Sequence, residues 1–231
     1  LAESSDRADD VVRFEGRNVL DPRLLDSTID VAFPVLHGPY GEDGTIQGLF
    51  EILGLPFVGA DTAASAVCMD KIFSKRMFVQ AGLATAPWVE LDRSSWSEDR
   101  NRIVERSLTL GLPLFVKPAR LGSSVGISKV SQEGALIDAI ELALGHGERA
   151  LVERGLDARE IEVAVLGGRH PRASMPGEIV PGHEFYDYED KYVDSACELF
   201  APAQLDPETM AAAPLATSSS ISLLLIPAIV E

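Results

Sequence analysis

The chain has 231 residues, of which 46% are hydrophobic and 24% charged, and its formal net charge is −16. This composition is ordinary for a globular protein of one large or two or three small domains. The negative charge argues against nucleic acid or anionic membranes as partners, because the chain offers no basic stripe to neutralise phosphates. Cys68 and Cys197 lie far apart without metal-ligand spacing, which predicts free thiols in a reducing, cytoplasmic compartment.

The two ends of the sequence differ from its interior. The chain begins at Leu1 without a methionine and opens with the acidic segment LAESSDRADD. Residues 211–231 are rich in Ala and Ser and finish on an apolar run that is far shorter than the ~20 residues of a membrane-spanning helix. We therefore expect a start inside a longer protein and an irregular, frameshifted or truncated tail.

Apolar runs and helical periodicity predict alternating strands and helices along the first half of the chain. The helix at 45–53 has one apolar face, and glycines at 82 and 111 are expected to close the two helices that follow. The predicted elements are strands at 31–36, 56–58 and 88–91 and helices at 45–53, 70–81 and 100–110.

The second half continues the same alternation, which is typical of layered α/β folds. Residues 114–116 form an apolar run suited to a buried strand, and Pro118 ends that strand. The further predicted elements are strands at 127–130, 150–152 and 161–166 and a helix at 133–144.

The segment LFVKPARLGSSVGISKV at 114–130 is the most informative motif of the chain. Gly122 and Gly126 bracket a loop that can adopt backbone angles closed to other residues, and Ser123 and Ser124 lie at its tip. Backbone N–H groups, two hydroxyl groups and the charge of Lys117 together are suited to binding a phosphate, although such loops are often plain hairpin turns. Neither GxxxxGK[ST] nor GxGxxG occurs, so the common nucleotide folds are disfavoured.

This segment resembles the glycine-rich loop and strand of the ATP-grasp superfamily and, within it, of the D-alanine–D-alanine ligases. Four other segments agree in order and spacing: HGPYGEDGTIQGLFEILGLPFVGA at 37–60, MDK at 69–71, LVERGLDAREIEVAVLGG at 151–168 and EFYDYEDKYVD at 184–194. The resemblance implies a mixed α/β and α+β fold, the ATP-grasp fold, in three lobes with the N- and C-terminal lobes incomplete. The expected divisions are a truncated substrate lobe at 1–59, a central lobe with the glycine loop at 60–153 and an incomplete lobe with the active-site lid at 154–231.

The resemblance also implies an ATP site between the second and third lobes. It assigns lysines to the phosphates, a carboxylate to the ribose and a chain segment to the adenine. A lysine at a helix start is more often solvated, and paired glutamates in a turn often face solvent, so each assignment has a structural alternative. The implied ATP ligands are Lys71, Lys117, Ser124 and Lys191 at the phosphates, Glu153, Arg154 and Leu156 at the adenine, and Glu160 at the ribose.

Substrate contacts follow from the same resemblance. His37 would contact the first D-alanine and Glu42 would order nearby groups, against the alternative of a structural histidine. In the lid, Tyr192 would pair with Ser123 over the active site and favour an amine acceptor over D-lactate, unless this segment is only surface. By contrast, Lys129 lies beyond the glycine loop and is expected to face solvent.

The implied reaction joins two D-alanines through an acyl phosphate, with ATP and Mg²⁺, to give the dipeptide used in peptidoglycan, and the resemblance allows a homodimer. The family's N-terminal Ser-X-Glu-His segment has no counterpart before Val31, and its C-terminal Arg-X-Asp and Asn-Glu-X-Asn segments have none after Pro207. No metal ligand is therefore predicted, and this chain alone is expected to contact ATP without turnover. The alternatives are a noncatalytic nucleotide-binding remnant or partner-binding module, a D-alanine–D-lactate ligase, or another ATP-grasp carboxylate-amine ligase.

Overall fold

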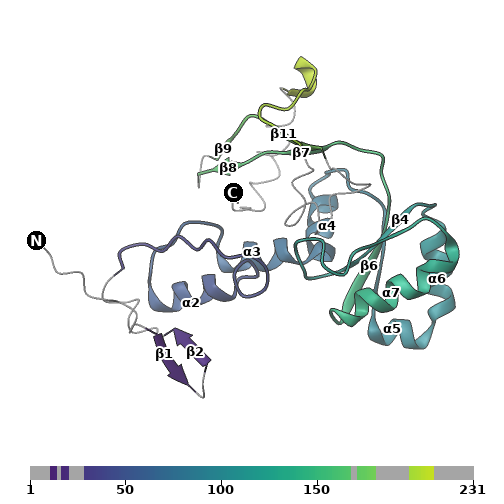
Figure 1. The fold of residues 1–231 in the computed structure, drawn as a ribbon, viewed down its shortest axis with the longest axis horizontal. Helices are drawn as coiled ribbons and strands as arrows, with labels where there is room; N and C mark the ends of the chain where they lie inside the picture. Colours follow the sequence, from purple (N-terminus) through teal and green to yellow (C-terminus); the bar gives the residue numbers. More distant parts are fainter. Residues whose placement is uncertain (1–10, 15–16, 21–28, 168–170, 181–197, 211–231) are drawn as a thin grey trace, which may run out of the picture.

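Figure 1 shows the chain as a computed structural model that describes residues 11–14, 17–20, 29–167, 171–180 and 198–210. The elements up to residue 108 are β1 (Val11–Phe14), β2 (Arg17–Leu20), α2 (Thr45–Leu53), α3 (Thr62–Met69), α4 (Lys71–Gln80), β3 (Trp88–Asp92), α5 (Arg93–Glu98) and α6 (Arg100–Leu108). The later elements are β4 (Leu114–Pro118), β5 (Ser128–Val130), η2 (Glu133–Ala135), α7 (Leu136–Gly145), β6 (Arg149–Arg154), β7 (Glu160–Glu162), β8 (Val165–Leu166), β9 (Arg172–Ala173), β10 (Gly177–Val180) and β11 (Glu198–Phe200).

A four-stranded sheet in the order β3-β6-β4-β5 organises the middle of the chain, and all its pairings are antiparallel. The α/β layers expected from the alternation of elements are therefore wrong for this part, which agrees instead with the α+β component of the fold that the resemblance implies. The connection between β4 and β5 is a loop of nine residues, from Ala119 to Ile127, and a parallel pair needs a crossover of a dozen or more. Among the described residues, the only parallel contact is an isolated bridge between Ala32 and Phe57.

The core lies between one face of this sheet and α5, α6 and α7. Alternate residues of β4 are buried, so Leu114 and Val116 face the core whereas Phe115 and Lys117 face the other way. The buried core consists of Leu91, Trp96, Ile103, Leu114, Val116, Val130, Leu136, Ala139, Ile140, Ala143, Leu144, Ala150 and Val152. This packing determines which side chains of the sheet remain for a ligand.

Helix α4 covers part of the other face of the sheet, where Ile72 packs with Ala119 and Leu151. The helices predicted at 45–53, 70–81 and 100–110 are confirmed as α2, α4 and α6, the last two being shorter than predicted. Gly82 and Gly111 have the positive φ angles, 78° and 81°, that favour glycine after a helix. Helices α3 and α5 and the antiparallel hairpin of β1 and β2 were not predicted.

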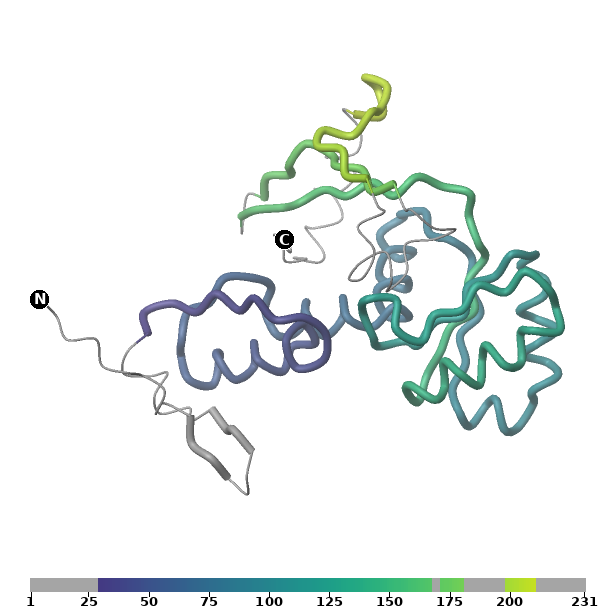
Figure 2. Tube along the Cα trace, viewed as in Figure 1, coloured from purple at the N-terminus to yellow at the C-terminus, as the bar shows by residue number. Residues whose placement is uncertain are grey.

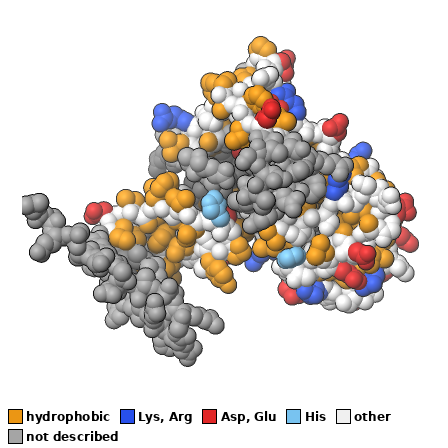
Figure 3. Space-filling view, viewed as in Figure 1, with side chains coloured by type: hydrophobic (Ala, Val, Ile, Leu, Met, Phe, Trp, Pro, Cys, Tyr) orange, Lys and Arg blue, Asp and Glu red, His pale blue; other side chains and the backbone are white. Residues whose placement is uncertain are grey.

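The strand predicted at 31–36 is wrong in extent, because only Ala32 makes a bridge there. Ala32 donates to the Pro56 carbonyl and accepts from Val58 N–H, so the prediction at 56–58 is likewise reduced to one bridge residue. A strand is stabilised by its partners, and no second partner is described on the other side of this segment. Val31, Phe33 and Val35 of this segment are exposed, as is Ile52 on α2. Figure 3 shows hydrophobic side chains gathered on the left of the face in view.

The C-terminal part rises away from the four-stranded sheet after β6 (Figure 2) and forms a three-stranded sheet in the order β11-β10-β7. The strand predicted at 161–166 is broken into β7 and β8, which pair with different partners, β10 and β9. Within the described residues, no helix has the length and apolar character to cross a membrane.

Candidate functional site

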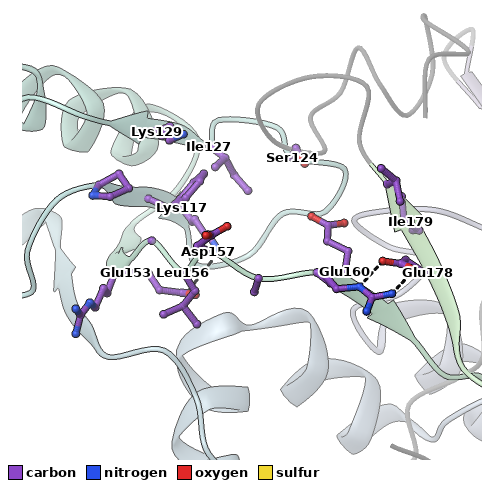
Figure 4. A pocket seen from close by; sticks show the side chains of 17 residues that line it. Lys117, Ser124, Ile127, Lys129, Glu153, Leu156, Asp157, Glu160, Glu178 and Ile179 are labelled. Atoms are coloured by element: carbon purple, nitrogen blue, oxygen red, sulfur yellow. Dashed lines mark hydrogen bonds and ion pairs between the residues drawn. The ribbon is translucent and has the colours of Figure 1, made fainter. Parts of the chain in front are cut away.

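A pocket of about 830 Å³ lies between the four-stranded sheet and the three-stranded sheet. In Figure 4, the strand that carries Glu178 and Ile179 lies opposite the ribbon that carries Lys117 and Glu153. The wall on the sheet side, which we call the sheet wall, consists of Pro113, Phe115, Lys117, Ser124, Ile127, Lys129, Glu153 and Arg154. The rest of the lining, which we call the opposite wall, starts at Gly155 beside Pro113 and continues to the facing strand; it consists of Gly155, Leu156, Asp157, Ala158, Arg159, Glu160, Glu178, Ile179 and Val180.

Strand register places the side chains of the sheet wall. Phe115 on β4 is the partner of Lys129 on β5 and of Glu153 on β6, and Glu153 is in turn the partner of Trp88 on β3. Partners in antiparallel strands point to the same face, so these four side chains form a row across the sheet, opposite the core. The expectation that Lys129 faces solvent is therefore wrong. Since its neighbour Val130 is 1% exposed and faces the core, Lys129 must point toward the pocket.

Glu153 is shared between two lysines. Its carboxylate lies 3.3 Å from Lys75 Nζ and 3.5 Å from Lys117 Nζ. Lys75 also donates to the Thr85 hydroxyl at 2.7 Å and to the Ala86 carbonyl at 2.9 Å, so it is held in place from several sides. Burial lowers the pKa of Lys75, and the attraction of Glu153 opposes this effect. If a bound anion drew Lys117 away from Glu153, Lys75 would therefore still neutralise the Glu153 carboxylate.

Lys71 begins α4 beside the end of β4. Its Nζ donates to the Pro118 carbonyl at 3.1 Å and to the Leu121 carbonyl, so it ties the helix to the approach of the glycine loop. Burial lowers the pKa of Lys71 to about 8, and repulsion from Lys117 adds to this shift, while Asp70 and Glu153 oppose it. Lys71 does not belong to the lining of the pocket but lies close enough to Lys117 to interact electrostatically.

The glycine loop has an unexpected backbone. Gly122 does not adopt a positive φ angle, whereas Ser123 and Ser124 do, at 49° and 56°, as does Gly126 at 71°. Two successive left-handed residues other than glycine store strain, which persists only when the surrounding structure holds it. At Gly126, a Cβ atom would approach the His146 ring to 2.6 Å, so both the angle and the space require glycine there.

An ion pair organises the opposite wall. Arg159 donates through two nitrogens to the two carboxylate oxygens of Glu178, each at 2.6 Å, and one of these nitrogens also reaches the Gln204 carbonyl at 2.7 Å. Both bonds to Glu178 are drawn in Figure 4. The pair joins the segment before β7 to β10 and places Glu160, the next residue, in the lining of the pocket. These hydrogen bonds lower the pKa of Glu178.

Comparisons with known proteins identify the family of the chain. A profile described as D-ala D-ala ligase C-terminus matches residues 77–223, and one described as D-ala D-ala ligase N-terminus matches residues 3–60. The chain belongs to the D-alanine–D-alanine ligase family. It is 55% identical over 183 residues to the D-alanine–D-alanine ligase of Thermoanaerobacter sp. (strain X514), which covers 79% of this chain and 51% of the relative.

Other ligases of the family give the same coverage. The ligase of Chloroherpeton thalassium is 52% identical over 178 residues, 77% of this chain and 49% of the relative. The chain thus spans about half the length of these curated relatives. Among solved structures, the VanG D-Ala:D-Ser ligase from Enterococcus faecalis has a TM-score of 0.75 at 35% identity. The match covers 91% of this chain and 58% of the VanG chain. The Coxiella burnetii ligase has a TM-score of 0.71 at 30% identity, with 86% and 52% covered.

The fold brings together around the pocket six of the twelve residues that the family resemblance singled out. Around the pocket lie Lys117, Ser124, Glu153, Arg154, Leu156 and Glu160. Ser123 is the neighbour of Ser124 in the same loop but is not in the lining. Lys191 and Tyr192 fall outside the described residues, so the predicted lid and its contact with Ser123 stay predictions.

His37 and Glu42 lie apart from this pocket, in the turn before α2. The Glu42 carboxylate accepts a hydrogen bond from Gly38 N–H, so it holds the turn in which His37 is exposed. The role of Glu42 in ordering groups around a substrate stays a prediction. The substrate role of His37 stays a prediction.

Sequence reasoning missed several charged residues of the site. It passed over Lys75, Asp70 and the pair of Arg159 with Glu178, and it placed Lys129 in solvent. Alternation from Val130 could have found Lys129, and the preference of Asp for the residue before a helix could have drawn attention to Asp70. The partners of Asp70, however, lie 50 and 79 residues away in the sequence, where no local pattern reaches.

Proposed function

We propose that the pocket binds ATP and that the protein from which this chain comes joins two D-alanines to D-alanyl-D-alanine. The observation that carries the proposal is the sheet wall itself. Lys117 and Lys129 supply positive charge, Phe115 and Ile127 supply apolar surface, and the glycine loop reaches the same space through Ser124. A base needs an apolar slot and phosphates need cations and N–H donors, and this wall offers both.

The proposed nucleotide contacts divide between the two walls. Lys117 and Ser124 would bind the phosphates, and Lys71, which lies behind Lys117 outside the lining, would add positive charge. The segment from Glu153 to Leu156 would meet the adenine edge, and the Glu160 carboxylate would accept from the ribose hydroxyl groups. The size of the pocket, about 830 Å³, is in the range of small-molecule sites and supports this assignment.

The proposed chemistry requires mainly charge neutralisation and alignment. A carboxylate oxygen of the first D-alanine attacks the γ-phosphorus and ADP leaves. The amine of the second D-alanine then displaces phosphate from the acyl carbon and loses a proton. Fixed positive charges such as Lys117 stabilise the charge that spreads over the transferred phosphoryl group, and the lid with Lys191 and Tyr192 would exclude water.

Mg²⁺ would neutralise phosphate charge in such a reaction. Among the residues that the structure describes, no group of three His, Cys, Asp or Glu side chains could hold a metal ion. A Mg²⁺ ion held by one or two carboxylates together with the phosphates needs no such group, and the proposed steps are assigned to the lysines of the chain.

Two measurements test this proposal. Calorimetry of the chain with a nonhydrolysable ATP analogue tests the nucleotide site, and we expect saturable binding that GTP does not reproduce at the same concentration. In the full-length protein, phosphate release that depends on both ATP and D-alanine, with the dipeptide identified by mass, tests the reaction. Absence of nucleotide binding, or phosphate release without dipeptide, would contradict the proposal.

One of the structural neighbours also supports D-serine as a second candidate for the acceptor substrate. The VanG neighbour is a D-Ala:D-Ser ligase and has a TM-score of 0.75 with this chain. Competition between D-alanine, D-serine and D-lactate at equal concentrations, with the products separated by mass, distinguishes the candidates. We expect D-alanyl-D-alanine as the main product, since curated relatives of 55% and 52% identity are D-alanine–D-alanine ligases. A predominance of D-alanyl-D-serine would favour the second assignment.

A further inference from the structure

The dipeptide Asp70-Lys71 contacts each of the four residues that lead into the glycine loop. Lys71 Nζ donates to the Pro118 and Leu121 carbonyls, and Lys71 N–H donates to the Ala119 carbonyl at 2.9 Å. Arg120 donates through Nε to the Asp70 carboxylate at 3.0 Å. We call residues 118–121 the loop stem. Every residue of this stem is thus bound to the start of α4.

The two oxygens of Asp70 have separate tasks. Oδ1 accepts from Ile72 N–H at 3.1 Å and from Phe73 N–H at 3.2 Å, and so caps α4. Oδ2 accepts from Arg120 and also from Arg149, at the start of β6. Asp70 is 0% exposed, and a buried carboxylate is tolerated only when it is paired and hydrogen bonded, as it is here.

The stem is also bound from the sheet side. Ala119 N–H donates to the Arg149 carbonyl at 2.9 Å, and Arg149 also contacts Asp70 through its guanidinium group. Asp70 thereby connects three segments that are distant in sequence: the start of α4, the loop stem and the start of β6. The stem lies directly between Lys117 and the strained residues Ser123 and Ser124.

We propose that Asp70 is a positioning residue that fixes the loop stem and thereby holds Lys117 and the glycine loop in the orientation needed for the nucleotide. This inference rests on the proposed function of the pocket. Left-handed angles at two serines persist only if the surrounding structure holds them, and the stem is the segment through which Asp70 does so. A loop that is ordered before binding avoids the entropy cost of ordering it during binding.

The test uses two variants that act on Oδ2 but differ in their effect on the helix cap. Asp70→Asn can retain the Oδ1 cap but replaces the acceptor facing the arginines with a donor. Arg120→Met leaves Asp70 and its cap intact, and the Arg120 side chain is 63% exposed, so its removal leaves no buried cavity. The matched control is Asp61→Asn, because Asp61 caps α3 through Ala64 N–H at 2.8 Å and is exposed.

Hydrogen exchange of the nucleotide-free chain is the first readout. We expect faster exchange of amides in 119–127 in Asp70→Asn and Arg120→Met, with partial recovery in Arg120→Lys and no change in Asp61→Asn. The second readout is affinity for a nonhydrolysable ATP analogue, which we expect to fall roughly three- to tenfold, the cost of ordering one or two more side chains on binding.

The outcomes separate this inference from the proposed function. If neither Arg120→Met nor Asp70→Asn changes exchange in 119–127, or if exchange rises while affinity is unchanged, the positioning role is overturned. If Asp70→Asn does not fold, Arg120→Met decides alone. If the wild-type chain binds no nucleotide, the proposed function fails. If, in addition, exchange in 119–127 is unchanged in Arg120→Met, the claim that Asp70 fixes the loop stem fails as well.

Discussion

The two walls of the pocket are held in place by different forces. On the sheet wall, Lys117 and Glu153 lie on strands whose alternate residues, such as Val116 and Val152, are 0% exposed in the core. On the opposite wall, Leu156 is 60% exposed and Val180 is 39% exposed, and the ion pair of Arg159 with Glu178 joins the segments. Core packing therefore places the residues of one wall, whereas on the other wall a charged pair adds to the backbone pairing of β10 with β7.

This difference predicts different sensitivities. A side chain set by close packing moves only when the core is disrupted, because protein interiors are close-packed and deform little. A segment joined by an ion pair whose Arg159 side chain is half exposed responds to charge, salt and pH, because solvent reaches and partly screens the pair. The following experiments apply each kind of perturbation to the two walls.

The largest expected effect is on the core beneath the sheet wall. Ile140 on α7 is 0% exposed, and we expect Ile140→Ala to lower the free energy of unfolding by about 2–5 kcal/mol, through lost burial and the cavity left behind. Chemical denaturation measures this change. Ile137→Ala is the matched control on the same helix, since Ile137 is 37% exposed. Equal losses in both variants would contradict the account of the core.

A smaller and more local effect is expected from Arg159→Met on the opposite wall. Glu178 then loses both bonds to the guanidinium group, so β7 and β10 should exchange amide hydrogens faster while the four-stranded sheet does not change. Hydrogen exchange read segment by segment gives the comparison, with Arg172→Met on exposed β9 as the control. Faster exchange in the four-stranded sheet as well would show that the two walls depend on each other.

Acid should loosen the same wall in the unmodified chain. Arg159 lowers the pKa of Glu178 below its ordinary value of 4.5, so the ionised form is favoured in the folded state. The stabilisation is fully present above the ordinary pKa and is lost as the pH falls through the lower, folded value. Chemical shifts of β10 in a pH titration should report this loss, and Arg159→Met should remove the downward shift. A Glu178 titration that is unchanged in the variant would contradict the role of the pair.

The smallest expected effect is the uptake of a proton by Lys71 when the nucleotide binds. Its pKa of about 8, lowered chiefly by burial, leaves it partly neutral in mildly alkaline solution. Phosphates nearby favour the charged form and raise this pKa, so binding should take up protons near pH 8 and hardly any at about pH 6. Calorimetry in buffers of different ionisation enthalpy measures the uptake, which Lys71→Met should abolish. Equal uptake in Lys71→Met would assign the proton to another group.

Local sequence patterns predicted part of the sheet wall and one helix outside it. Glu153 was singled out only through the family resemblance, whereas the apolar run at 114–116 predicted β4, the glycine loop pointed to Lys117 and the periodicity at 45–53 predicted α2 with the same bounds. These features depend on alternation and helical period, which a short window of sequence contains. Lys129 was wrongly predicted to face solvent. A buried Val130 implies, by alternation along the strand, that Lys129 points to the opposite face of the sheet.

Features that depend on distant partners were beyond local patterns. The segment at 31–36 has strand-like residues but forms a single bridge, because strand formation depends on its neighbours. Asp70 acquires Arg149 as a partner only through the fold. The left-handed angles at Ser123 and Ser124, rather than at Gly122, likewise reflect how the loop stem is held and not the preference of the residues themselves.

The affinity of Lys117→Met for a nonhydrolysable ATP analogue tests most directly the claim that the sheet wall binds nucleotide phosphates. Lys75 remains on Glu153 in this variant, so no buried carboxylate loses its last counterion. Loss of a charge-assisted contact costs about 1.5–3 kcal/mol, so calorimetry should show roughly 10- to 150-fold weaker binding. The control is Arg76→Met, which removes the exposed ion pair between Arg76 on α4 and Glu90. This variant should bind the analogue as the wild type does. Equal affinities of Lys117→Met and wild type would contradict the account.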